Sequence, residues 1–142
     1  MKNLLFTILI TASTVSAGSA QGIFRVSAGT EMLVNNGVRI VLNNTSFESN
    51  GGLGLGSLSR FVFTGNSSVA SISGTGNIVF GELEFNKPSG VVQLNRMVSI
   101  FSGVNFTSGN LDLNGNTLFF VADPNGQLTA ENNNSRIIGN TG

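Results

Sequence analysis

Six aliphatic residues recur in this sequence at a fixed interval of 20 positions, and this period constrains the fold more than any other feature. They are Val38, Leu58, Ile78, Val98, Leu118 and Ile138. Two further apolar columns have a similar spacing: one contains Phe63, Leu83 or Phe85, and Phe106, and the other contains Ile72, Val92 and Leu111. Three inward-facing strands in about every 20 residues are typical of a β-solenoid, in which each rung, one full circuit of the chain, stacks on the rung before it.

Short segments with an apolar residue at every second position fill most of the chain after residue 20. Residues 61–63, 83–85 and 98–100 are examples. This alternation is the period of a half-buried strand, whereas alanine is scarce and glycine interrupts every candidate helical window. We therefore predict an all-β chain that forms a right-handed parallel β-helix (β-solenoid) with rungs of about 20 residues. The alternative is an antiparallel β-sandwich, which also has short alternating strands.

The same period predicts which side chains form the core. Inward positions of successive rungs should lie above one another, about 4.8 Å apart, and form continuous apolar columns. The residues predicted to be buried are Val98, Ile100, Leu111, Leu113, Leu118 and Phe120.

The polar composition fits such rungs. The chain contains 19 glycines and 19 asparagines, the residues that best accept the positive φ angles of tight corners. Asn95 and Asn114 each follow an inward leucine, so we expect their side chains to hydrogen-bond from one rung to the next. Only 10% of the residues are charged, as expected where stacking places like side chains above each other.

Residues 1–20 have the composition of a secretory signal peptide. One lysine precedes the apolar run Leu4–Ile10, and small residues follow it. This run is too short for a permanent membrane anchor. We therefore expect residues 1–20 to be removed, a mature chain that begins near Gly18 or Gln21, and a secreted or cell-surface location reached through the secretion machinery.

The remaining chain divides by the regularity of its pattern. Residues 21–60 match the period poorly and are predicted to form an irregular β segment or cap, whereas residues 61–142 are predicted to form regular β-solenoid repeats. Gly51–Gly56 is the most glycine-dense stretch. It lacks the Gly-Lys-Ser/Thr sequence of a phosphate-binding loop, so we interpret it as a flexible loop or irregular rung.

The second half of the chain resembles a known kind of repeat. Residues 63–66, 80–87, 90–94 and 106–118 read FTGN, FGELEFNK, GVVQL and FTSGNLDLNGNTL. This series resembles the repeat region of large secreted or cell-surface β-helix proteins of the Bacteroidetes, and the resemblance extends from Phe63 to Gly142. It implies an exported structural or adhesive segment whose repeats continue in a longer parent protein.

The apolar column still runs at Ile137 and Ile138, close to the end of the sequence. The terminal rungs of a solenoid expose unpaired backbone groups, and such edges favour association. We therefore expect either a longer parent protein or end-to-end self-association of this chain.

Several classes of site are excluded by composition. Histidine and cysteine are both absent, which rules out Cys/His zinc sites, thiol catalysis, His-based triads and disulfides. The net charge is zero, so no basic face is expected for nucleic acid. No cofactor or metal is implied.

Glu82 and Glu84 are the best candidates for catalytic chemistry. They alternate with Leu83 and Phe85, so both should point outward from one strand, about 7 Å apart, a separation that suits the two carboxylates of a glycosidase. Lys87 and Arg96 are the candidate cationic partners. We nevertheless interpret all four as ordinary surface charges, and we expect no enzyme activity and assign no catalytic residue.

The sequence thus favours an exported structural or adhesive solenoid that contacts a surface glycan or another protein through its outer face. The alternative is a polysaccharide-binding or polysaccharide-cleaving β-helix domain.

Overall fold

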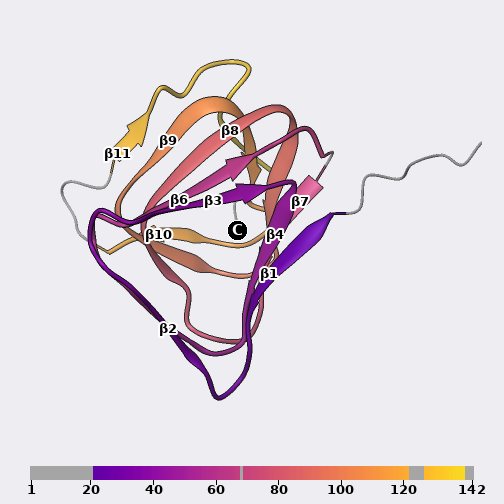
Figure 1. Ribbon diagram of the computed structural model, residues 1–142. Helices are drawn as coiled ribbons and strands as arrows, with labels where there is room; N and C mark the ends of the chain where they lie inside the picture. The colour runs from indigo at the N-terminus through magenta and orange to yellow at the C-terminus, as the bar shows by residue number, and fades with distance from the viewer. Residues whose placement is uncertain (1–20, 68, 122–126, 140–142) are drawn as a thin grey trace, which may run out of the picture.

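The computed structural model describes residues 21–67, 69–121 and 127–139. The predicted signal peptide, residues 1–20, lies outside the described residues. The described chain is all β, without a helix, and forms a β-solenoid of about five rungs. All pairings between its named strands are parallel, which confirms the predicted solenoid and excludes the antiparallel sandwich. In Figure 1 the rungs follow one behind another around a common interior.

Each rung has three sides, and equivalent sides of successive rungs form three stacks. The first stack contains β1 (Gly22–Val26), β4 (Thr45–Ser49), β7 (Val69–Ser73), the last part of β8 (Val79–Leu94), the last part of β9 (Val98–Asp112) and β12 (Ile137–Ile138). The second contains β2 (Glu31–Val34), β5 (Gly52–Leu55), the first parts of β8 and β9, and β10 (Leu118–Phe120). The third contains β3 (Arg39–Asn43), β6 (Arg60–Thr64), the middle parts of β8 and β9, and β11 (Gln127–Thr129).

The length of a rung varies along the chain. Val98 pairs with Leu118, as the fixed interval predicts, whereas Phe47 pairs with Ile72, which lies further along the chain than that interval allows. The column at a fixed interval is therefore wrong at its N-terminal end. Val38 and Leu58, which the column placed in the core, are 42% and 66% exposed. The column is also wrong at its C-terminal end, because Ile138 pairs with Asp112 on the first stack, whereas Leu118 lies on the second.

Phenylalanine rings form the clearest column in the core. Phe63, Phe85 and Phe106 occupy one inward position on three successive rungs, with ring centroids 5.9 Å and 5.3 Å apart. Of the two residues predicted for the middle of this column, Phe85 is thus the correct one. The other predicted column is shifted, because Val92 pairs with Ala70 rather than with Ile72.

Most of the predicted core is buried. Val98, Ile100, Leu111 and Leu113 are buried, as expected. Leu118 and Phe120 are only half-buried, because they lie on β10, which packs on β9 from one side.

Asparagine side chains join the rungs at their corners. In four cases the Oδ1 atom of an asparagine accepts a hydrogen bond from a backbone N–H of the next rung, at 2.8–3.1 Å; the pairs are Asn36 with Leu58, Asn44 with Ser67, Asn50 with Thr75, and Asn110 with Arg136. The predicted pair is also present, since Asn114 Nδ2 donates to Asn95 Oδ1 at 3.2 Å. Corner N–H groups without a strand partner are thereby satisfied, which explains the high asparagine content.

The glycine-rich stretch is more ordered than a flexible loop. Residues 52–55 form β5, which pairs in register with β2 in a separate two-stranded sheet. Of the two interpretations of this stretch, the flexible loop was therefore wrong for these residues, whereas an irregular rung is compatible with their separate sheet. The five strands β1–β5 lie in residues 21–60, and the division of the chain at residue 60 stays a prediction.

Candidate functional site

Charged residues come together on the outer face of the third stack. Strand pairing aligns one outward position on five successive rungs, which we call the outer row: Arg39, Arg60, Glu82, Gly103 and Gln127. Glu84 lies two residues beyond Glu82 on the same face, in register with Val62. The strands alternate between this face and the core, so the same backbone that buries Leu83 and Phe85 presents the two glutamates outward.

Two arginines and two glutamates form an ion network across three rungs. Arg60 bonds Glu82 through Nε at 3.0 Å and Nη2 at 2.8 Å, and it also reaches Glu84 through Nη1 at 3.2 Å. Arg39 Nη2 contacts the other oxygen of Glu84 at 3.4 Å. Arg60 therefore bridges both carboxylates, and Glu84 bridges both guanidinium groups.

The network is more buried than an ordinary surface ion pair. Glu84 is buried, although it faces outward, and Val62 beside it on the same face is fully buried. Hydrogen bonds from Arg60 to Glu82 are the main cause that raises the pKa of Arg60. The expectation that both glutamates are solvated was therefore wrong for Glu84, which is held between two cations.

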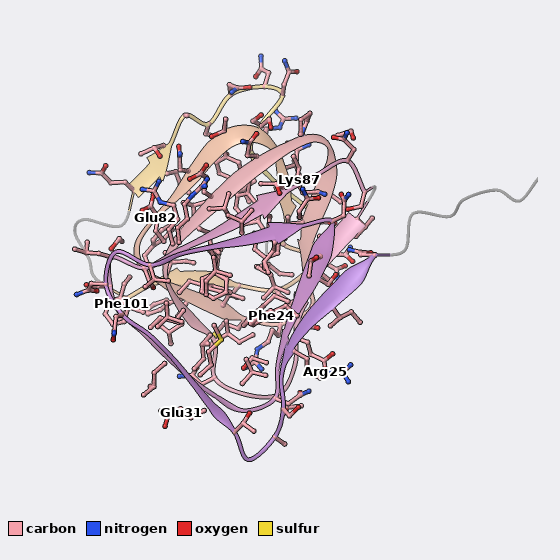
Figure 2. The ribbon with its side chains drawn as sticks, viewed as in Figure 1. Phe24, Arg25, Glu31, Glu82, Lys87 and Phe101 are labelled. Atoms are coloured by element: carbon pink, nitrogen blue, oxygen red, sulfur yellow. The ribbon has the colours of Figure 1, made fainter. Side chains whose placement is uncertain are left out.

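Lys87 and Arg96 do not join this site. Lys87 is buried at a corner of the rung, where its Nζ donates to the backbone oxygen of Ser67 at 3.1 Å and to its Oγ at 3.0 Å. Arg96 Nη1 donates to the backbone oxygen of Gly74 at 2.7 Å. Figure 2 shows Glu82 and Lys87 at different corners of the solenoid. Both cations thus donate hydrogen bonds to the preceding rung rather than to the glutamates. The interpretation of Lys87 as an ordinary surface charge was therefore wrong, because its side chain is buried.

Two hollows lie along the outer row. The first has a volume of about 270 Å³ and is lined by Gly37, Val38, Arg39, Leu58 and Arg60. The second has a volume of about 210 Å³ and is lined by Glu82, Ser102, Gly103, Val104, Gln127 and Thr129. The first combines guanidinium groups with aliphatic side chains, whereas the second combines one carboxylate with hydroxyl and amide groups.

The sequence reasoning missed Arg39 and Arg60, the partners that define the site. A signal was present, because Arg39, Arg60 and Glu82 recur at nearly the same spacing as Phe63, Phe85 and Phe106, and each begins an alternating apolar segment. A search for charged columns at the spacing of the phenylalanines, rather than at the interval of the aliphatic column, would have found them.

The comparisons with known proteins add no relative. No protein-family profile, no curated protein and no solved structure matches the chain. Within residues 21–67, 69–121 and 127–139, no three Asp or Glu side chains come together as metal ligands. In the same residues there is no helix of the length and apolarity needed to cross a membrane.

Proposed function

We propose that this chain is an exported structural and adhesive β-solenoid segment of a bacterial cell-surface or extracellular protein. The observation that carries the proposal is the combination of an apolar core running through all rungs with a separate polar outer face. The stacked strands supply many parallel backbone hydrogen bonds, which suit a rigid spacer. The outer face supplies a regular surface that a partner can contact over several rungs.

The proposal includes the absence of enzyme activity. Sugar hydrolysis requires two carboxylates that face the substrate between them, one of them free to transfer a proton. Here Glu82 and Glu84 both accept hydrogen bonds from one guanidinium, that of Arg60. Each carboxylate is thus an ion-pair partner of a stacked arginine, which favours a structural role over an acid–base role.

The first and last described rungs support an association between solenoid ends. Phe24 packs on Phe47 with ring centroids 5.9 Å apart and is still 36% exposed. Leu128 is aligned with the buried Val104 and is 42% exposed. The apolar side chains at both ends resemble those that pack between neighbouring rungs. We therefore propose that they pack against further rungs, from a second copy or from a longer parent chain.

The export proposal is tested by expressing the full chain in a bacterium and separating cytoplasm, envelope and medium. We expect the chain in the envelope or medium, with an N-terminus near Gly18 or Gln21 by peptide sequencing. A chain that keeps Met1 and stays in the cytoplasm contradicts export.

The absence of enzyme activity is tested by incubating the chain with a panel of polysaccharides, which should release no new sugar ends. Turnover that is lost in Glu84→Gln would contradict the structural assignment.

A further inference from the structure

We propose that the outer face of the third stack binds an acidic oligosaccharide, which lies along the solenoid axis with a carboxylate on Arg39. This inference rests on the proposed adhesive function, for which it names the contact surface and the class of ligand. The binding surface consists of the outer row and the two hollows beside it.

The shape of the surface fits an extended ligand. The outer row crosses five rungs, which at a spacing of about 4.8 Å gives a length of about 19 Å. The first hollow lies against the strands of the first two rungs, and the second lies against those of the last three. A chain of several linked units can reach both hollows, whereas a compact small molecule cannot.

Arg39 is the group best placed to bind a carboxylate. Its contact with Glu84 is long, 3.4 Å, and its side chain is 53% exposed. A guanidinium has five N–H donors and can hold a carboxylate through two parallel hydrogen bonds, so Arg39 has donors to spare. Arg60, by contrast, is already bonded to two glutamates. The exposed side chains of Val38 and Leu58 in the same hollow provide an apolar wall for the carbon skeleton of a sugar ring.

The second hollow selects against a ligand that is anionic throughout. Its lining contains the carboxylate of Glu82 together with Ser102, Gln127 and Thr129. The carboxylate would repel a second anionic group but can accept hydrogen bonds from sugar hydroxyls, and the neutral side chains can exchange hydrogen bonds with them. The preferred ligand therefore carries its acidic unit at the arginine end and neutral, hydroxyl-rich units at the other.

The backbone of this surface favours a sugar over a peptide. An extended peptide usually binds by adding a strand to a free sheet edge through main-chain hydrogen bonds. In the middle of the third stack, β6 pairs with β3 on one side and with β8 on the other, so its backbone groups are already occupied. A ligand on this face must be held by side chains, which suits a molecule whose hydrogen-bonding groups are hydroxyls.

The experiment measures binding of the full chain by calorimetry. The probes are an oligosaccharide with one terminal glucuronate on neutral hexoses, the neutral oligosaccharide of the same length, an oligogalacturonate and an oligoglutamate peptide. We expect the singly acidic sugar to bind tightest, and Arg39→Gln to weaken it about 10-fold, as loss of a charged bidentate contact should. Thr129→Val should weaken binding of the same probe by a smaller factor.

The matched control is Arg25→Gln. Arg25 also pairs across one rung with a glutamate, Glu48 at 2.8 Å, but it lies on the first stack, and Figure 2 shows Arg25 and Glu82 on opposite sides of the solenoid. This variant should bind like the unchanged chain, and circular dichroism should show that all variants are folded. The inference is overturned if the neutral sugar binds as tightly as the singly acidic one, or if Arg39→Gln leaves the affinity for the acidic sugar unchanged. It is also overturned if the oligoglutamate peptide binds more tightly than the acidic sugar, or if no probe binds. Export and the solenoid fold are measured separately, so the proposed function can survive that result.

Discussion

The third stack carries two columns of side chains on the same strands, and the two columns follow opposite rules. On the inner side, one residue type repeats, and Phe63, Phe85 and Phe106 stack ring on ring. On the outer side the residue changes along the row, from Arg39 and Arg60 to Glu82 and then to uncharged residues.

The physical reason is the short distance between rungs. Stacking like side chains about 4.8 Å apart is favourable for apolar groups, which exclude water together, and unfavourable for like charges. The stacked pair Arg39 and Arg60 is therefore accompanied by Glu82 and Glu84 on the following rung. Packing of the core therefore determines the residue types of the inner column, whereas the residue types of the outer column can vary and form a specific surface.

The strongest way to break this contrast is a charge in the core. Val98→Asp places a carboxylate on the inner side of the second stack, where the side chain is fully buried and its surroundings are apolar. We expect a loss of several kcal/mol, about the whole stability of a small domain, and an unfolded or aggregated chain by circular dichroism. Ser99→Asp is the matched control, because the neighbouring residue faces the other way and is only half-buried. A normally folded Val98→Asp variant would show that the core tolerates charge.

A cavity in the phenylalanine column should have the next largest effect. Phe85→Ala removes a ring that contacts Phe63 on one rung and Phe106 on the next. We expect the free energy of unfolding to fall by about 3–5 kcal/mol, as measured by chemical denaturation. Asn105→Ala, which changes the outer face of the same stack, should cost about 1 kcal/mol for the hydrogen bond that its Oδ1 accepts from Thr129. Equal losses in the two variants would contradict the separation of inner and outer columns.

The core was also the part of the molecule that the sequence predicted best. The alternation and repeat of apolar residues predicted the strands, their parallel stacking and the burial of Val98, Ile100 and Leu111. These features were predictable because positions in a repeated core require apolar residues. Leu118 and Phe120 follow the same pattern but are less buried, since burial also depends on whether a rung lies between two neighbours.

The register was less predictable. A rung can gain or lose residues at its corners without disturbing the stacks, so a fixed interval fails wherever a corner is longer. The corner of Gly74 illustrates this: its φ is +115°, and a Cβ there would collide with the backbone oxygen of Ser49 on the preceding rung. Such a corner is recognisable as a glycine, but its length is set by contacts with the rung beside it.

The outer site was the least predictable part. Glu82 and Glu84 were correctly placed outward by alternation, but their partners depended on the register. Once Arg60 is known to lie beside Glu82, the ion network follows from charge alone. Without that register, Lys87 and Arg96 were closer in sequence and were the natural, but wrong, candidates.

Removal of Arg60 tests how strongly the outer column contributes to stability. Arg60→Gln leaves Glu84, whose side chain is 10% exposed, with only the long contact to Arg39. We expect a loss of about 2 kcal/mol in denaturant unfolding, less than for Phe85→Ala because Arg60 is itself partly exposed to water. Arg25→Gln is the control, since its pair with Glu48 is exposed and should contribute much less. A larger loss in Arg25→Gln than in Arg60→Gln would contradict the assignment of a partly buried network.

Lys87 lies at the boundary between the two kinds of column and provides the subtlest test. It is the only lysine after residue 20, its side chain is 1% exposed, and its described hydrogen bonds go to the neutral oxygens of Gly65 and Ser67. Burial lowers the pKa of its amine below the ordinary value of 10.5.

This shift gives stability a defined pH dependence. Between the lowered pKa of the folded chain and 10.5, the unfolded chain binds more protons, so the free energy of unfolding rises as pH increases through that window. Lys87→Met keeps an unbranched side chain of similar length without the amine. As pH rises, the free energy of unfolding of the unchanged chain should therefore increase relative to that of the variant. Arginine side chains keep their charge over this range, and the N-terminal amine titrates equally in both proteins, so the difference isolates Lys87. A difference that is independent of pH would mean that the amine is solvated in the folded state and that this corner belongs to the outer face rather than to the core. A difference that moves against the unchanged chain would mean that folding favours the charged amine, which contradicts burial as the dominant effect.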